Sequence, residues 1–213
     1  HEAFIVVDEA HATGVWGPEG RGLAAAFEGR DNIIVLHTCG KALGASGALV
    51  TGPALLCDYL VNRCRPFIYS TAPSPLMAVA VREAIAMLSD EPQRRVQLQE
   101  RVTFAGRQLA ERCGVAPSGS QIQPFVIGDN RRTMAVAAAL QARGFDIRGI
   151  RPPTVPEGTS RLRLALMASH TKAELREAAR ALGRAALPAG FRPGAGVPLA
   201  AAPDTGPFES VAA

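Results

Sequence analysis

Short apolar runs mark the first part of the chain. They cover residues 3–7 (AFIVV), 33–37 (IIVLH) and 45–52 (ASGALVTG), and polar or glycine-rich segments bound them. Runs of this length, rich in β-branched residues, are typical of strands that are buried on both faces of a parallel sheet. Residues 53–64 open with a proline and place apolar residues on one face, which predicts a helix. The pattern therefore predicts the end of a mostly parallel α/β sheet.

Two longer helical patterns follow a proline-punctuated segment at 65–75, which we predict to be a loop. Residues 76–90 are apolar nearly all round, and this predicts a buried connecting helix. Residues 92–113 carry leucine, valine and alanine at helical spacing with charges between them, and Gly114 follows. This second pattern predicts a long amphipathic surface helix.

The remaining pattern predicts a small α+β domain. Strands are predicted at 122–127, 146–150 and 161–167, and helices at 130–143 and from Thr171 onward. Thr171 and Glu174 form a T-x-x-E sequence, which is typical of a capping box at a helix start. After residue 187 the chain is rich in Pro, Gly and Ala, and we predict disorder there. We therefore divide the chain into a large-domain part at 1–90, a small domain at 91–187 and a tail at 188–213.

The composition is that of a globular protein. Hydrophobic residues make up 47% and charged residues 20% of the 213 positions. No apolar stretch approaches the roughly 20 residues of a spanning helix, and the start lacks the pattern of a signal peptide. We expect a cytoplasmic protein with no membrane partner. The four cysteines contain no CxxC pair, so we expect reduced thiols and no metal site. Because the sequence starts at His1 and enters a strand almost at once, we expect a C-terminal fragment.

Positive charge is carried almost entirely by arginine. The net charge is +4, and the basic residues are interleaved with Asp and Glu, which argues against a nucleic-acid partner. Only two of the 23 basic residues are lysines, Lys41 and Lys172. Lys41 lies among small residues in HTCGKALGASG (37–47). A desolvated lysine can lose its proton and form a Schiff base, which arginine cannot do. The alternative is a lysine merely tolerated in a glycine-rich turn.

The segment FIVVDEAHATG (4–14) contains the letters of a helicase DEAH box. A phosphate-binding loop of the G-x-x-x-x-G-K-[ST] type does not occur in the sequence, because Gly40-Lys41 is followed by Ala42. The downstream S-A-T and Q-x-x-G-R-x-G-R elements of helicases are also absent from it. A DEAH-type helicase fragment is therefore a remote alternative.

Four polar residues follow two neighbouring predicted strands. Asp8 and His11 come after the first strand, and Thr38 and Lys41 after the second, so all four could reach one ligand at the same sheet edge. Pyridoxal phosphate requires such a set: a carboxylate for its ring nitrogen, a donor to its phenolate oxygen, a hydroxyl for its phosphate and a lysine for its aldehyde. The sequence thus predicts a pyridoxal-phosphate site.

Four motifs give a specific family resemblance. They are DEAHATGVWGPEGRG (8–22), TCGKALG (38–44), RPFIYSTAPSP (65–75) and IRPPTVPEGTSRLRLALMASHT (150–171). In this order they are similar to the C-terminal half of fold-type I pyridoxal-phosphate enzymes of the α-oxoamine synthase family. The resemblance implies an α/β fold: the C-terminal part of the large cofactor-binding domain plus a small α+β domain.

The resemblance also implies roles for the matching residues in the cofactor site. Asp8 would pair with the pyridinium nitrogen, His11 with the phenolate oxygen and Thr38 with the phosphate, while Lys41 would bond covalently to the cofactor. Ser70 and Thr71 would reach the phosphate of a neighbouring subunit's cofactor, which implies a homodimer.

For the substrates, the resemblance implies that Arg163 binds the amino-acid carboxylate and that Thr154 lines the acyl pocket. A bidentate guanidinium suits the carboxylate role. For the nearby Arg151 and Arg161 we favour surface or interdomain ion pairs. His37 and Ala48 stand where many relatives carry glycine, a departure that we expect to affect strand packing only.

Within the family, AHATG and IRPPTVP are most similar to the member that acts in biotin synthesis. This implies a decarboxylative condensation of L-alanine with pimeloyl-CoA or pimeloyl-acyl carrier protein to 8-amino-7-oxononanoate. Lys41 would act as the base. Alternatives are another α-oxoamine synthase, such as a glycine C-acetyltransferase, a same-fold aminotransferase, or a fragment that is inactive without its other half.

Overall fold

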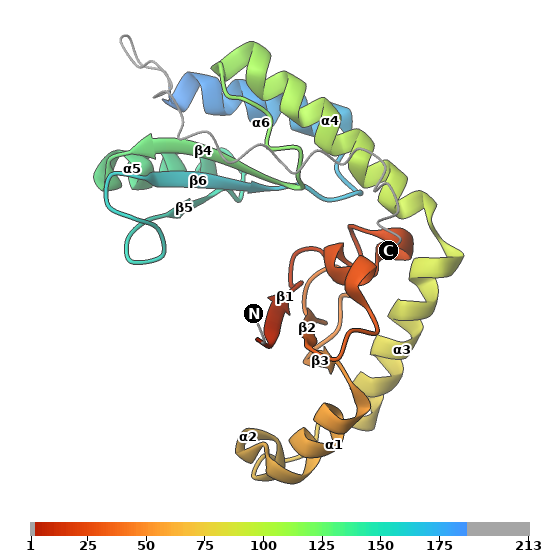
Figure 1. The fold of residues 1–213 in the computed structure, drawn as a ribbon. Coiled ribbons are helices and arrows are strands. Elements are labelled where there is room, and N and C mark those ends of the chain that lie inside the picture. Colours follow the sequence, from red (N-terminus) through yellow and green to blue (C-terminus); the bar gives the residue numbers. More distant parts are fainter. Residues whose placement is uncertain (1–2, 187–213) are drawn as a thin grey trace. The chain divides into compact units, whose positions relative to one another are not determined.

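The computed structural model describes residues 3–186, which form two compact units dividing between Arg95 and Val96. Each unit contains a three-stranded sheet (Figure 1). The first holds, in chain order, β1 (Ile5–Asp8), η1 (Pro18–Gly20), η2 (Leu23–Phe27), β2 (Ile33–Thr38), β3 (Ala48–Thr51), α1 (Ala54–Arg63), α2 (Arg65–Ile68) and α3 (Pro75–Asp90). Helix α4 (Gln93–Cys113) crosses the boundary, and β4 (Ile122–Gly128), α5 (Asn130–Gln141), β5 (Arg148–Ile150), β6 (Ser160–Ala165) and α6 (Lys172–Ala186) follow. The predicted tail at 188–213 lies outside the described residues.

The first sheet has the order β1-β2-β3. Strands β1 and β2 are parallel, and β3 pairs antiparallel with β2. Because side chains alternate along each strand, Val7, Ile33 and Val35 share one face, where they pack against Ala24. The opposite face carries Asp8. The predicted strands are confirmed, and the sequence did not indicate the antiparallel direction of β3.

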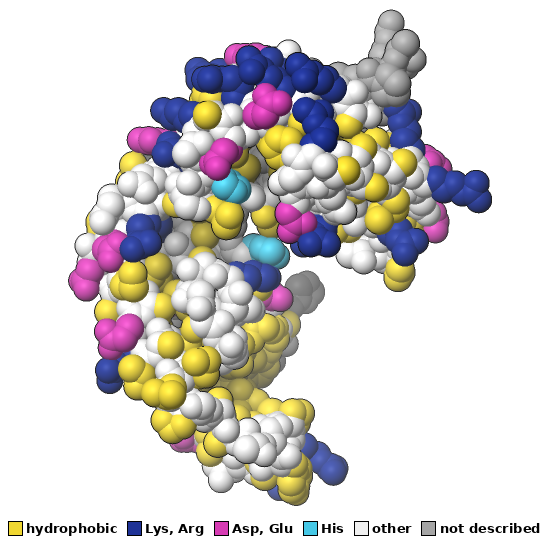
Figure 2. Space-filling view, turned by 180° about the vertical axis from the view of Figure 1, so that it is seen from behind, with side chains coloured by type: hydrophobic (Ala, Val, Ile, Leu, Met, Phe, Trp, Pro, Cys, Tyr) yellow, Lys and Arg dark blue, Asp and Glu magenta, His cyan; other side chains and the backbone are white. Residues whose placement is uncertain are grey.

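Two burial predictions for this unit are wrong. Strand β1 was expected to be buried on both faces, but Ile5 and Val6 are 50% and 67% exposed, because β1 pairs only with β2 among residues 3–186. Helix α3 was expected to be buried, but Val81 is its one buried residue and Leu76 is 74% exposed. Only one side of α3 packs on the described chain. Figure 2 shows further apolar side chains gathered on the surface around α1 and α2.

The segment predicted as a loop at 65–75 begins with a short helix, α2, which the sequence analysis missed. Pro66 lies in its first turn, where the fixed φ of proline favours a helix start and its missing N–H costs nothing. The prolines were therefore misread as breakers along the whole segment.

The second sheet is antiparallel and has the order β4-β6-β5. Helices α4, α5 and α6 cover one of its faces (Figure 1), and the core between the layers contains Phe125, Leu140, Leu162 and Leu182. The predicted α+β arrangement and the amphipathic surface helix are confirmed. The predicted capping box is also confirmed, because Thr171 N–H and Oγ1 bond Glu174 Oε2 at 2.8 and 2.9 Å.

All four cysteines are free thiols, as predicted. Burial raises the pKa of the Cys113 thiol, an effect that the nearby Arg112 partly opposes. Among residues 3–186 no group of His, Cys, Asp and Glu is arranged to hold a metal ion. Within the same range, no helix has both the length and the apolarity to cross a membrane.

Candidate active site

The carboxyl ends of β1 and β2 place two of the predicted site residues together. Asp8 of β1 pairs with Leu36 of β2, and Thr38 lies two residues after Leu36. The side chains of Asp8 and Thr38 therefore lie on the same face and at the same end of the sheet. Asp8 Oδ1 accepts a hydrogen bond from Ala10 N–H at 2.8 Å. No basic side chain of the described chain forms an ion pair with Asp8. Its exposed carboxylate can therefore accept a cationic partner.

Lys41 lies in a turn whose backbone is held by hydrogen bonds before and after it. Cys39 N–H donates to Gly47 O at 2.9 Å, and Ala45 N–H donates to Cys39 O at 2.9 Å. Cys39 and Leu43 are buried against Val81 of α3, whereas Lys41 itself is exposed. Within residues 3–186 its ammonium forms no ion pair. The backbone is thus anchored while the amine remains accessible.

The turn that carries His11 packs directly on the lysine turn. Residues 9–14 form successive backbone turns, in which Ala12 and Thr13 N–H donate to Glu9 O. Gly14 then adopts φ +79°, and a Cβ placed on it would lie 2.9 Å from the Cβ of Ala42. Only glycine combines that φ with so close an approach. The DEAH segment and the residue next to Lys41 are therefore in contact.

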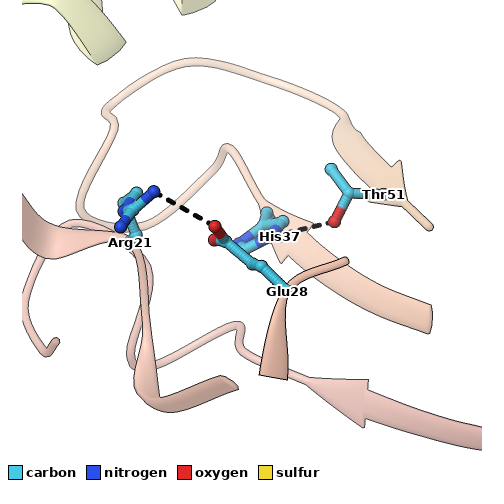
Figure 3. Close-up of polar contacts among 4 residues, drawn as sticks. All are labelled: Arg21, Glu28, His37 and Thr51. Atoms are coloured by element: carbon cyan, nitrogen blue, oxygen red, sulfur yellow. Dashed lines mark hydrogen bonds and ion pairs between the residues drawn. The ribbon is translucent and has the colours of Figure 1, made fainter. Parts of the chain in front are cut away.

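A histidine joins the same two segments by hydrogen bonds. Thr13 Oγ1 donates to Glu9 O at 2.9 Å and lies 2.8 Å from His37 Nδ1. Because the single hydroxyl proton is already used, Thr13 accepts from Nδ1–H. His37 Nε2 lies 3.4 Å from Thr51 Oγ1 (Figure 3). The sequence analysis gave His37 only a packing role, because nothing in its spacing indicates a partner 24 residues earlier.

His37 also borders a cavity of about 450 Å³, which is lined mostly by apolar side chains of β2, β3, α3 and the segment around η2. The Arg21–Glu28 ion pair, at 3.1 Å, lies at the same cavity (Figure 3). The predicted cofactor residues do not line it. Asp8 and Thr38 belong to the opposite face of the sheet, so this cavity is separate from the predicted cofactor site.

Glu9, the second acidic residue of the DEAH segment, has a structural role. Its side chain is buried, and its Oε1 accepts a hydrogen bond from Ala24 N–H. A Cβ on Gly22 would lie 2.9 Å from the Glu9 carboxyl carbon. Glu9 therefore holds the glycine-rich strand connection in place and is not available to a nucleotide-bound metal.

The other predicted site residues lie elsewhere. Ser70 and Thr71 are exposed directly after α2, and Ser70 Oγ donates to Pro66 O. Thr154 lies in an exposed loop, and Arg163 is exposed on β6 of the second unit. The structure thus brings Asp8, Thr38 and Lys41, with the His11 turn, to one end of the first sheet.

The ion pairs expected for Arg151 and Arg161 are not found among residues 3–186. Arg161 Nε donates instead to Thr159 O at 2.9 Å. Strands β4, β5 and β6 contain no Asp or Glu, so the sheet offers these arginines no acidic cross-strand neighbour.

Residues 1–182 match the family of aminotransferase class I and II proteins. The chain belongs to this family. The 8-amino-7-oxononanoate synthase of Anaeromyxobacter dehalogenans (strain 2CP-1) is 48% identical over 82% of this chain and 44% of its own length. That of Cupriavidus taiwanensis is 41% identical over 87% of this chain and 48% of its own. The chain thus spans about half the length of the curated relatives it matches.

Solved structures agree with this assignment. A structure of SPT with its pyridoxal phosphate as an internal aldimine superposes with a TM-score of 0.78 and 27% identity, over 86% of this chain and 47% of that one. The 8-amino-7-oxononanoate synthase of Francisella tularensis gives 0.73 and 26%, over 84% of this chain and 53% of its own. The predicted fold-type I α/β architecture is confirmed. The helicase alternative is wrong, and the DEAH letters are a coincidence.

Proposed function

We propose that the chain is part of a pyridoxal-phosphate-dependent C-acyltransferase that acts as an 8-amino-7-oxononanoate synthase. The relatives named above support this reading at 41–48% identity. The structural observation that carries it is the contact of Gly14 with Ala42, because this contact joins the segment of Asp8 and His11 to that of Lys41.

The residues at this end of the sheet fit the cofactor chemically. Asp8 offers an accessible carboxylate without an ion-pair partner in the described chain, and Lys41 offers an accessible amine. Thr38, half-buried at the end of β2, offers a hydroxyl to the phosphate, and His11 a ring nitrogen to the phenolate oxygen. When bound, pyridoxal phosphate draws electrons from the Cα bonds of an attached amino acid. Asp8 would keep the ring nitrogen protonated for this purpose.

The same proposal gives roles to the remaining residues. Lys41, as a free amine, takes the proton from Cα of L-alanine. Arg163 holds the alanine carboxylate with its two-pronged guanidinium, and Thr154 lines the acyl pocket. Ser70 and Thr71 bind the cofactor phosphate of the partner subunit in a homodimer.

The proposed reaction joins Cα of L-alanine to the thioester carbon of a pimeloyl donor. The carrier thiol of coenzyme A or acyl carrier protein leaves, and carbon dioxide is lost from the alanine carboxylate. Reprotonation at Cα gives 8-amino-7-oxononanoate. An aminotransferase would instead release a keto acid and retain the carboxylate, so release of labelled carbon dioxide distinguishes the two. The cytoplasmic location remains a prediction.

Borohydride trapping tests the proposal at its central residue. The chain is incubated with pyridoxal phosphate, reduced and digested, and the modified peptide is identified by mass spectrometry. We expect the adduct on Lys41, and we expect Lys41→Ala to abolish it while circular dichroism stays unchanged. Lys172→Ala is the matched control and should leave the adduct in place. Equal labelling of both lysines, or an adduct that persists in Lys41→Ala, would refute the proposal.

A further inference from the structure

The second sheet carries arginines on the face that the helices do not cover. Along β6, Leu162 and Leu164 are buried in the core, so the alternating residues Arg161 and Arg163 lie on the opposite face. Strand β5 pairs with β6 so that Arg148 lies directly opposite Arg163. Residues directly opposite each other share a face of the sheet. Three guanidinium groups therefore occupy one side of two neighbouring strands.

The positive charges of these three arginines are not fully balanced by nearby negative charges in the described chain. Like charges directly opposite each other across two strands are destabilising unless something neutralises them. Arg148 Nε lies 2.6 Å from Asp146 Oδ1, but both side chains are largely exposed, at 64% and 74%. Neither Arg161 nor Arg163 forms an ion pair within residues 3–186. Within residues 3–186, Asp146 is therefore the one carboxylate that forms an ion pair with any of the three guanidinium groups, and a bound anion would relieve the repulsion.

The neighbouring strand gives this surface an apolar border. Pro124 lies opposite Arg163, and Val126 lies opposite Arg161, and both are half-buried on β4. Guanidinium groups beside apolar side chains are less hydrated than those in open water, which strengthens their hydrogen bonds to carboxylate or phosphate oxygens. The surface therefore suits an anionic small molecule that also has an apolar part.

We propose that Arg148 and Arg161, which lie beside Arg163 on the same face of the sheet, bind an anionic group of the acyl donor. The group is a phosphate of coenzyme A or the far carboxylate of the acyl chain, since both present oxygens that match a guanidinium fork. This inference rests on the proposed function, which assigns Arg163 alone to the amino-acid carboxylate. It adds Arg148 and Arg161 as residues that recognise the donor.

Nuclear magnetic resonance of arginine side chains tests this site directly. The 213-residue chain, labelled at arginine Nε, is titrated with coenzyme A and, separately, with pimelate. We expect saturable shifts at Arg148 and Arg161 with at least one of the two probes, and these shifts should weaken as salt is added. Saturation by coenzyme A assigns a phosphate, and saturation by pimelate assigns a carboxylate. If neither probe saturates, the inference is overturned.

Three variants are expected to change the affinity for the probe in different ways. Arg148→Gln should weaken binding of the saturating probe about two- to five-fold, as removal of one exposed charge partner does. Asp146→Asn should strengthen binding, because it frees Arg148 from its competing carboxylate. Arg131→Gln, an exposed arginine on α5, is the matched control and should change nothing. Equal weakening by Arg148→Gln and Arg131→Gln, or no gain in Asp146→Asn, contradicts the site. Neither cofactor nor Lys41 takes part, so this failure is separable from failure of the proposed function.

Discussion

His37 connects the two segments that carry the proposed chemistry. Its Nδ1 bonds Thr13 in the turn after β1, and its own strand continues into Thr38 and the Lys41 turn. A side-chain hydrogen bond in a largely buried setting costs more when one partner is left unsatisfied than it contributes when formed. We therefore regard His37 as a positioning residue and not only as a packing residue.

A double-mutant cycle tests the bond between His37 and Thr13. We expect Thr13→Val and His37→Leu each to lower the free energy of unfolding by about 1–2 kcal/mol, because each removes the hydrogen bond between Thr13 Oγ1 and His37 Nδ1. The double variant should cost less than the sum, with a coupling of about 0.5–1.5 kcal/mol. Urea unfolding measures all three. Thr51→Val, at the long 3.4 Å contact, is the control and should change little. Additive losses would show that the two residues act independently.

At the residue scale, the sequence was enough to predict the location of side chains that end a strand or follow it closely. Asp8, Thr38 and Lys41 could be placed together because parallel strands end at the same edge. The hydrogen bond between Thr13 and His37 could not be predicted, because it depends on the path of the chain between the two residues. The buried role of Glu9 was equally hidden, because an acidic residue in a turn is usually exposed.

The start of α6 shows how local sequence determines an element. Thr171 N–H and Oγ1 donate to the Glu174 carboxylate, and Glu174 N–H donates back to Thr171 Oγ1 at 3.2 Å. These hydrogen bonds, with a smaller contribution from His170, lower the pKa of Glu174 below its ordinary value of 4.5. The ionised form is favoured in the folded state, so this stabilisation is present above pH 4.5 and lost as pH falls through the lowered pKa.

Thr171→Ala should lower the free energy of unfolding by about 1 kcal/mol at pH 7, the usual effect of losing an N-cap. The loss should shrink as pH falls through the lowered pKa of Glu174, because the carboxylate then becomes protonated. Glu174→Gln should flatten this part of the pH dependence. Urea unfolding across that pH range provides the measurement, and Thr171→Ser, which keeps the hydroxyl, serves as the control. A loss for Thr171→Ala that stays the same from pH 7 to the acid end of the series would contradict the mechanism.

Elements whose neighbours are distant in sequence were harder to predict. The apolar patterns of β1 and α3 correctly gave a strand and a helix, yet both are largely exposed in the described chain. The spacing of apolar residues shows that an element has an apolar face, but it does not show which part of the protein covers that face. The direction of β3 was hidden for a similar reason, since it is set by the closed turn between residues 38 and 47.

At the scale of the whole molecule, β1 leaves one hydrogen-bonding edge of its sheet unpaired within residues 3–186. Phe4, Ile5 and Val6 are exposed beside this edge. An open apolar edge strand is a template for pairing with another chain. We therefore expect the 213-residue chain to self-associate in a concentration-dependent way.

Val6→Lys should reduce that self-association, because a charge on an edge strand disfavours pairing, while secondary structure stays unchanged at this exposed position. Sedimentation velocity over a concentration series gives the association state, and circular dichroism reports the fold. Val7→Lys is the contrasting variant. It places a charge against Ile33 and Val35 and should destabilise the unit. Unaltered sedimentation of Val6→Lys would show that the edge of β1 does not mediate the contact.

The contact of Gly14 with Ala42 has a mechanical consequence. The backbone at Gly14 meets the short side chain of Ala42 there, and no long, flexible side chain lies between these two distant segments. Neither can move toward the other, so hard-sphere contact sets the shortest spacing between the segment that carries the acid and the turn that carries the amine. A ligand that pushed one of these segments toward the other would therefore move both.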